Sequence, residues 1–418
     1  MAADLPTGGE ITAGAGSIAT SGHEMTITQD TAKMAAEWQS FSIGKNHSVN
    51  FVQPSSDAVA LNRVLGSDVS VIQGALNANG KIFLINPNGV LFTPDAQVNV
   101  GGIVASTLDM NTADFLAGNY TFEGDSTAAV TNQGVINAPG GFVALIAATI
   151  INEGSITSDS GAVLAGAGRK VTLDLGGPVK LEVEEGALET LIEQGGAMRA
   201  DGGRVLLTAK AAGDLASSVI NHTGITEAQT LATGEKGEII LLGDMGEGTL
   251  NVGGTLNATA PAAGTDGGFI ETSAAHVHIE EGASVTTGDG GTWLIDPYNY
   301  VINVGEAATI SGALNAGGAV VIDTTNDVAG HGSSGNGGQG GDITINNAIQ
   351  KTSANSSTLT LNAHRDIAIN ADITSTDGVL SMTFNADSDR DLDGAVTVKG
   401  NLATRGGNLN FGSDSTYK

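Results

Sequence analysis

Residues 80–110 read GKIFLINPNGVLFTPDAQVNVGGIVASTLDM, and the tetrapeptide Asn86-Pro87-Asn88-Gly89 divides this stretch into two apolar segments. Proline fixes φ near about −65° and lacks an amide donor, while asparagine and glycine tolerate positive φ. The tetrapeptide therefore predicts a tight turn. The apolar residues before and after it predict two short strands that this turn joins.

A glycine followed by an apolar run recurs far beyond this turn. The glycines that open these runs are Gly141, Gly161, Gly203, Gly237, Gly268 and Gly291. The intervals between them are 20, 42, 34, 31 and 23 residues. We interpret 20 residues as one coil of a solenoid, 42 as about two coils, and the other intervals as one coil with an excursion.

A second motif has asparagine two residues before glycine and an aliphatic residue after it. Asn132 and Asn152 open two copies one 20-residue period apart, and the segments at Asn221 and Asn251 look like later copies. Such a period, with several short strands and no helices between them, predicts an all-β fold, a parallel β-helix. A β-sandwich or barrel array is the alternative, but it would show hairpin spacings of about 8–12 residues and stronger alternation of apolar and polar residues.

Two stretches interrupt the period. Residues 178–199 carry Leu188, Leu191 and Ile192 at helical spacing, and we expect a surface excursion there, either a short helix or a hairpin. Residues 326–341 are rich in glycine and serine and predict a flexible loop.

The first 50 residues supply aromatic and branched side chains that are scarce elsewhere in the chain. A solenoid needs a sealed end, because an open ladder invites edge-to-edge pairing. We therefore predict an N-terminal cap built on Trp38, Phe41, Ile43, Val49 and Phe51.

Composition limits the classes of partner. The chain has 418 residues, no cysteine and a formal net charge of −28, so we predict neither nucleic acid nor an anionic membrane surface as a partner. No apolar stretch approaches the roughly 20 residues of a membrane-spanning helix, which predicts that the chain is not membrane-inserted. Residues 1–20 lack the features of a signal peptide, and we expect a mature N-terminus on a fragment of a longer protein.

Catalytic chemistry has little support in the sequence. A polysaccharide-active β-helix enzyme needs acidic residues clustered on one face, whereas the acidic residues here are dispersed and no GxSxG motif occurs. We therefore predict that the chain is not an enzyme. His276 and His278 share one face of a strand, but no third zinc ligand is evident, so we interpret them as surface histidines.

One acidic run resembles the opening of a calcium loop, and otherwise we predict no cofactor. Its carboxylates are Asp387, Asp389, Asp391 and Asp393, and Gly394 follows them. Counted from Asp389, position 12 is Gly400, where a calcium loop requires a bidentate glutamate. The run is thus a weak calcium candidate, and a solvated loop is the alternative.

Four segments occur in an order that resembles a known family: Val59–Val64 (VALNRV), Gly74–Leu76, Phe83–Gly89 and Gly102–Leu108 (GIVASTL). The resemblance is to the N-terminal secretion domain of two-partner secretion exoproteins, the filamentous haemagglutinin and high-molecular-weight adhesin family. Asn62-Arg63-Val64 followed by Asn86-Pro87-Asn88-Gly89 resembles the adhesin branch, and the sequence lacks the NPNL-type turn that the haemagglutinin carries at the earlier position. Further on, Trp293–Pro297 (WLIDP) resembles a motif that follows the secretion domain in large exoproteins.

The resemblance implies a right-handed parallel β-helix with an N-terminal cap and excursions outside the coils. It implies export via the periplasm, through a cognate outer-membrane transporter that recognises the unfolded domain, to the surface of a Gram-negative bacterium. The residues that match the family's turn motifs are Asn62, Arg63, Asn86, Pro87, Asn88 and Gly89. Their implied role is shaping the fold, and direct contact with the transporter is the alternative.

We accordingly expect a secretion domain with its cap over residues 1–260 and a continuing β-helix stalk over residues 261–418. The predicted function is that of a secreted adhesin fragment that directs export and nucleates β-helix folding. A ligand-capturing exoprotein for a host haem carrier or a glycan is one alternative, and the secretion end of a cytolysin or growth-inhibition toxin is another. A host or matrix receptor would bind a downstream region.

Overall fold

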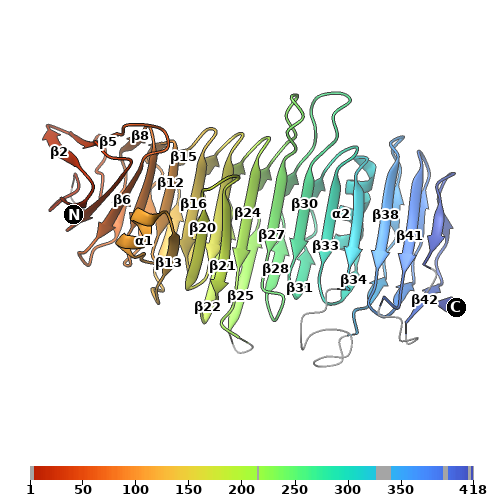
Figure 1. Ribbon diagram of the computed structural model, residues 1–418. Coiled ribbons are helices and arrows are strands. Elements are labelled where there is room, and N and C mark those ends of the chain that lie inside the picture. Colours follow the sequence, from red (N-terminus) through yellow and green to blue (C-terminus); the bar gives the residue numbers. More distant parts are fainter. Residues whose placement is uncertain (1–3, 214–215, 326–339, 389–393, 413–415, 418) are drawn as a thin grey trace. The chain divides into compact units, whose positions relative to one another are not determined.

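The computed structural model describes residues 4–213, 216–325, 340–388, 394–412 and 416–417 (Figure 1). The chain forms two compact units, residues 1–218 (unit 1) and residues 219–418 (unit 2). In both units short strands stack into parallel sheets, so the predicted parallel β-helix is confirmed. Within a coil, the chain passes once through each of three sheets.

Unit 1 builds its three coil sheets in regular succession. The first contains, in spatial order, β1 (Glu10–Ala13), β4 (Lys33–Trp38), β6 (Val59–Val64), β9 (Lys81–Ile85), β12 (Gly102–Ser106), β16 (Phe142–Ala147), β19 (Ala162–Ala167) and β24 (Arg204–Ala209). The second contains β7 (Ser70–Ile72), β10 (Val90–Phe92), β14 (Ala129–Asn132), β17 (Thr149–Asn152) and β22 (Glu189–Gln194). The third contains β2 (Gly16–Ser21), β3 (Glu24–Gln29), β5 (Ser48–Val52), β8 (Ala75–Ala78), β11 (Gln97–Asn99), β15 (Val135–Asn137), β18 (Ser155–Thr157) and β23 (Ala197–Arg199).

The repeating glycines lie where adjacent coils approach each other most closely. A Cβ on Gly161 would collide with the carbonyl of Gly141, and a Cβ on Gly203 would collide with that of Gly161. Only glycine fits these positions, which explains the periodicity. The strands after Gly161 and Gly203 are direct neighbours, with Ala162 opposite Arg204. The 42-residue interval is therefore one coil with an excursion, and its interpretation as two coils is wrong.

The asparagine of the second motif lies inside the coil. Asn132 donates to the Oδ1 of Asn152 at 2.8 Å, and Asn152 donates to the Oε1 of Gln194 at 2.7 Å. This ladder satisfies buried amides and fixes the register between coils. The prediction placed the later copies one residue too early in the chain. Asn221 and Asn251 form a hydrogen bond with each other on the outer face of the coil, not inside it. The buried positions beside them hold His222 and Val252.

The N-terminal segment closes one end of unit 1. β1 runs antiparallel to β4, and β2 runs antiparallel to β3, whereas β3 pairs in parallel with β5 and β4 in parallel with β6. The five side chains predicted for the cap are all buried. Trp38 and Phe41 pack edge to face, with ring centroids 5.3 Å apart.

Two excursions leave the coils of unit 1 and pack on the outer face of its first sheet. They contain α1 (Thr112–Ala117), β13 (Tyr120–Glu123), β20 (Lys170–Asp174) and β21 (Lys180–Glu185). The last three form an antiparallel sheet. An excursion with a hairpin is therefore present, but it spans β20 and β21, so only its second strand lies within the predicted residues 178–199. The helix alternative is wrong, because Leu191 and Ile192 lie in β22 and pair with β17.

Unit 2 begins with three strands in each of two sheets. They are β25 (Ser217–His222), β28 (Thr249–Val252) and β31 (His276–Ile279) in one, and β26 (Ile225–Glu227), β29 (Thr255–Asn257) and β32 (Ser284–Thr286) in the other. Its longest sheet contains β27 (Glu238–Leu242), β30 (Phe269–Ser273), β33 (Thr292–Asp296), β35 (Ala319–Asp323), β38 (Ser357–Asn362), β41 (Leu380–Asn385) and β44 (Leu409–Phe411). Later coils form β34 (Tyr300–Ile302), β36 (Ile343–Ile345), β39 (Ile367–Ile369), β42 (Ala395–Val398) and β45 (Thr416–Tyr417), and β37 (Ile349–Lys351), β40 (Ile373–Ser375) and β43 (Leu402–Ala403).

A helix separates the early from the late coils of unit 2. α2 (Val304–Asn315) packs against β32 and β37, where the other coils place a strand (Figure 1). The expectation of strands without helices is thus wrong here. Asn303 and Glu306 form a capping box at its start, a spacing that the sequence displays. Of the loop expected at residues 326–341, residues 326–339 lie outside the described part of the chain.

Candidate functional site

The NPNG segment forms a β-turn between β9 and β10. The amide of Gly89 donates to the carbonyl of Asn86 at 3.0 Å, and Gly89 has a φ of 114°. The side chain of Asn86 accepts a bond from the amide of Asn88 at 2.9 Å. Proline at the second position and glycine at the fourth position suit this turn, because one presets φ and the other tolerates a positive value.

The same turn ties neighbouring coils together. Asn86 is fully buried, and its Nδ2 donates to the carbonyl of Asp68 at 2.9 Å and to the hydroxyl of Ser70 at 3.0 Å. Asn88 donates to the carbonyl of Gly66 at 2.8 Å. From the following coil, the hydroxyl of Ser126 donates to the carbonyl of Pro87 at 2.6 Å. Pro87 itself is exposed.

Asn62 lies within β6 rather than in a turn, and it is fully buried. Its Oδ1 accepts the indole N–H of Trp38 at 3.1 Å, and its Nδ2 donates to the carbonyls of Ala60 and Phe83. A buried indole N–H without an acceptor would be costly. Asn62 therefore provides the polar partner that lets Trp38 fill the cap.

Arg63 projects from the outer face of the same strand. Its guanidinium forms ion pairs with Glu37 at 3.4 Å and Asp109 at 2.8 Å. It also donates to the hydroxyl of Thr112 at 3.1 Å and to the carbonyl of Met110. Its side chain is only 13% exposed, so these bonds are shielded from bulk water. Arg63 thereby fastens the segment that leads into α1 onto the capped coils.

Two buried glutamines join Asn62 and Asn86 in linking these coils, and no sequence motif marks them. Gln53 donates to the Oε1 of Gln29 at 2.9 Å and accepts the amide of Gly80 at 2.9 Å. Gln29 donates to the carbonyl of Val59 at 3.1 Å. Isolated glutamines carry no motif, and only the coil register shows that these two meet. We call Gln29, Gln53, Asn62 and Asn86 the buried amides of the first coils.

The other candidate residues form no comparable site. Of the acidic run, Asp387 is buried with a φ of 57°, while Asp389, Asp391 and Asp393 lie outside the described residues. His276 and His278 lie on β31, half-buried and exposed respectively. Within the described part of the chain, no group of three or more His, Cys, Asp or Glu side chains is placed to hold a metal.

Residues 2–245 match the model of the TPS secretion domain, the two-partner secretion domain. The chain belongs to this family. The family directs export of exoproteins that are secreted or surface-exposed in Gram-negative bacteria, and it implies an outer-membrane transporter as partner. It is a family of export domains and is typically non-enzymatic.

Two curated relatives from Haemophilus influenzae are called heme/hemopexin-binding protein. One, from strain Rd, is 35% identical over 258 residues, which is 58% of this chain and 28% of the relative. The other is 46% identical over 103 residues, 25% of this chain and 11% of the relative. The chain thus spans less than a third of the length of these relatives.

The HMW1 secretion domain from Haemophilus influenzae is a solved structure with the same fold. The two structures align with a TM-score of 0.59 and 22% identity, over 97% of this chain and 99% of that one. This likeness concerns the fold alone. No helix among the described residues has the length and apolar character needed to cross a membrane.

Proposed function

We propose that the capped first coils of this secretion domain are the nucleus on which the exported chain folds. The observation that carries this proposal is the concentration of buried amides there. Gln29, Gln53, Asn62 and Asn86 bond to groups of neighbouring coils, and each bond needs only residues that precede position 107. These bonds can close before the rest of the chain has emerged.

Addition of coils to that nucleus would favour outward movement of the chain through the transporter. Each added coil buries apolar side chains and completes the ladder of the coil before it. Backward diffusion of the chain through a transporter would require that coil to unfold. In this role Asn86 shapes the turn and is shielded from solvent, while only Pro87 and Asn88 of the NPNG turn are accessible to a transporter.

What the exported protein binds outside the cell is a separate proposal. The sequence predicts an adhesin, with a stalk over residues 261–418 and a receptor-binding region downstream. Capture of a host haem carrier is the second candidate, because the two curated relatives are heme/hemopexin-binding proteins. Pull-down of the complete exoprotein with immobilised hemopexin distinguishes the two. Specific retention of the exoprotein supports capture of a haem carrier, and absence of retention contradicts it.

Export kinetics test the nucleation proposal. The complete exoprotein is co-expressed with its cognate transporter, and secreted protein is quantified over time for the wild type, Asn86→Ala and Asn152→Ala. Both asparagines are buried and hydrogen-bonded, but Asn152 belongs to a later coil. We expect Asn86→Ala to slow secretion several-fold and Asn152→Ala to slow it less.

Thermal melting of the purified chains is the control for stability. If Asn86→Ala lowers the melting temperature but leaves secretion at the wild-type rate, folding of the first coils does not limit export. Equal slowing by the two variants would also contradict nucleation at the capped end. Slow secretion of Asn86→Ala with an unchanged melting temperature would instead favour direct contact with the transporter.

A further inference from the structure

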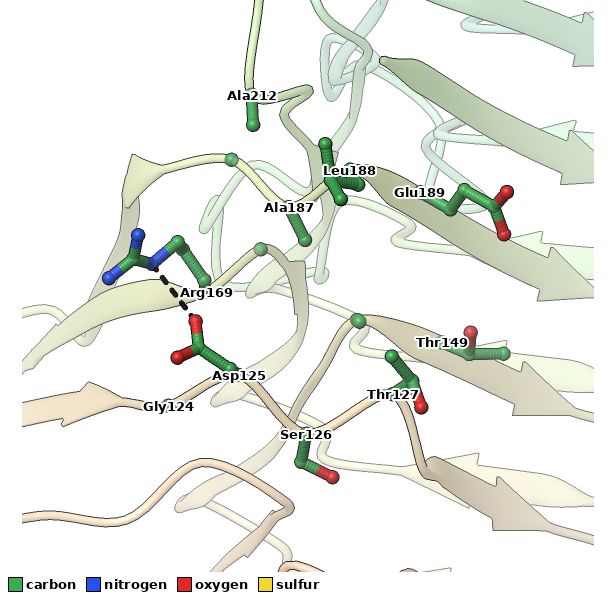
Figure 2. A pocket seen from close by; sticks show the side chains of 13 residues that line it. Gly124, Asp125, Ser126, Thr127, Thr149, Arg169, Ala187, Leu188, Glu189 and Ala212 are labelled. Atoms are coloured by element: carbon green, nitrogen blue, oxygen red, sulfur yellow. Dashed lines mark ion pairs between the residues drawn. The ribbon is translucent and has the colours of Figure 1, made fainter.

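A pocket of about 550 Å³ opens on unit 1 between its two excursions. The coil between them turns from β16 to β17 through a single residue, Ala148. The coils on either side send out α1 with β13 and the β20–β21 hairpin at this same corner. The stems of the excursions therefore stand as walls, and the short corner leaves a hollow between them (Figure 2).

Small apolar residues line this hollow, and one large apolar side chain stands over it. Ala148, Ala187 and Ala212 line the pocket together with Leu188. Figure 2 shows Ala187, Leu188 and Ala212 around it. Leu188 is 77% exposed, more than any other large apolar side chain in the described part of the chain. Covering such a side chain together with the alanines would remove apolar surface from water, which favours association.

The edge of the pocket carries excess negative charge. Arg169 lies 3.6 Å from carboxylate oxygens of both Asp125 and Glu185, and 3.9 Å from one of Glu123. Figure 2 shows the pair with Asp125, and Glu189 lines the pocket as a further carboxylate. Arg169 thus faces three carboxylates, and Glu189 adds a fourth negative charge to the lining of the pocket.

A second hollow of about 490 Å³ extends this acidic surface. Asp109, Asp114 and Glu123 line it, and its cation, Arg63, is already paired with Glu37 and Asp109. The two hollows adjoin, because the guanidinium of Arg169, which lines the first, lies 3.9 Å from the carboxylate of Glu123, which lines the second. An apolar socket therefore continues into an acidic groove.

We propose that this surface binds a segment of another protein in which an aromatic or large aliphatic side chain is flanked by lysine or arginine. The apolar side chain would enter the pocket over Ala148 and contact Leu188. The flanking cations would pair with Asp125, Glu189 and the carboxylates of the acidic groove. A second copy of this chain is disfavoured as the occupant, because two chains of net charge −28 repel each other.

Fluorescence anisotropy with labelled peptides tests this proposal on the complete chain. The probe is fluorescein-KKFKK-amide, and the comparison peptides are KKGKK and EEFEE with the same label. The variants are Leu188→Lys at the pocket and Leu65→Lys as a matched control, since Leu65 is 61% exposed elsewhere in unit 1. Leu188 and Leu65 are both exposed, so neither substitution should affect folding, and circular dichroism verifies this.

We expect KKFKK to bind about tenfold more tightly than KKGKK, because only the former fills the pocket, and EEFEE not to bind. Leu188→Lys should weaken KKFKK binding about tenfold, while Leu65→Lys should leave it within twofold. Equal affinity for KKFKK and KKGKK, or equal effects of the two variants, would overturn the proposal, since binding would then reflect net charge alone. Absence of binding, or a concentration-dependent dimer that Leu188→Lys abolishes in sedimentation, would overturn it as well.

Discussion

The two units of this protein bury different kinds of polar side chain. Among the described residues, the buried amides all belong to unit 1: Gln29, Gln53, Asn62, Asn86, Asn132, Asn152 and Gln194. The buried histidine, lysine and aspartate side chains among these residues all belong to unit 2: His222, Lys351, His364 and Asp387. Both kinds fix one coil against the next, but only the second kind changes its charge with pH.

This difference fits the proposed order of folding. Amides offer donors and acceptors at every pH, so the coils that fold first keep the same register whatever the surroundings. In unit 2, Lys351 donates to the carbonyls of Ser353 and Asp377 at 2.6 and 2.7 Å, and burial lowers the pKa of its ammonium. Coils added later can carry such groups because a folded template already fixes their register.

The largest effect should come from breaking the contact between coils in unit 1. In Gly161→Ala, the new methyl group would meet the carbonyl of Gly141, and we expect a loss of about 3 kcal/mol in the free energy of unfolding. Gly177 has open space around its Cα, so Gly177→Ala should cost less than about 1 kcal/mol.

Denaturant unfolding in a Trp293→Phe background measures this change. Trp38 is then the sole tryptophan, and it reports on unit 1 alone. Equal stability of Gly161→Ala and Gly177→Ala would show that the glycine column does not set the coil spacing.

Removal of a buried amide of the first coils should cause the next largest loss in the free energy of unfolding. Asn62→Ala removes the acceptor of the Trp38 indole N–H and leaves a small cavity, so we expect a loss of about 2 kcal/mol. Asn137, which bonds Asn99 on the outer face, is the matched control, and Asn137→Ala should cost less than about 0.5 kcal/mol. The same Trp38 signal measures both variants, and a smaller loss for Asn62→Ala than for Asn137→Ala would refute the assigned role.

The smallest effect concerns pH and unit 2. Burial lowers the pKa of His222 below its ordinary value of 6.5, and the two ring nitrogens form hydrogen bonds with the Gly253 carbonyl and the Thr226 hydroxyl. As the pH falls below 6.5, the unfolded chain takes up a proton that the folded chain does not. Between pH 6.5 and 5.5, unit 2 should therefore lose at most about 1 kcal/mol of stability, and less as the folded pKa is approached.

His222→Gln should remove this loss, because the amide still donates to the Gly253 carbonyl and has no charge to gain. His278→Gln is the control, since His278 is exposed on β31 of the same unit. Unfolding of unit 2 is followed by Trp293 fluorescence in a Trp38→Phe background at the two pH values. The same pH dependence in His222→Gln and the wild type would assign it to another group.

The sequence was most informative where a constraint repeats. The glycine period predicted the β-helix, because a Cβ at Gly161 or Gly203 would collide with a carbonyl of the preceding coil. The asparagine motif was correct at Asn132 and Asn152 but misplaced by one residue at Asn221, where only burial distinguishes it from His222.

Contacts between distant residues were beyond prediction. The bonds of Arg63 to Met110 and Thr112, and the meeting of Gln29 with Gln53, depend on how coils of unequal length align. The pocket over Ala148 depends on a corner of one residue between two long excursions, and no local motif encodes that. In contrast, the capping box at Asn303 and Glu306 was available to predict α2.

The order in which the coils fold is the central claim, and pulsed hydrogen exchange during refolding tests it most directly. The complete chain is diluted from denaturant, labelled for milliseconds at increasing delays and analysed by peptide mass spectrometry. If folding begins at the capped end, amides of β3, β5, β6 and β9 become protected first, and those of β38 and β41 last. Protection that begins in β38 and β41, or that rises at one rate in both units, would contradict this order.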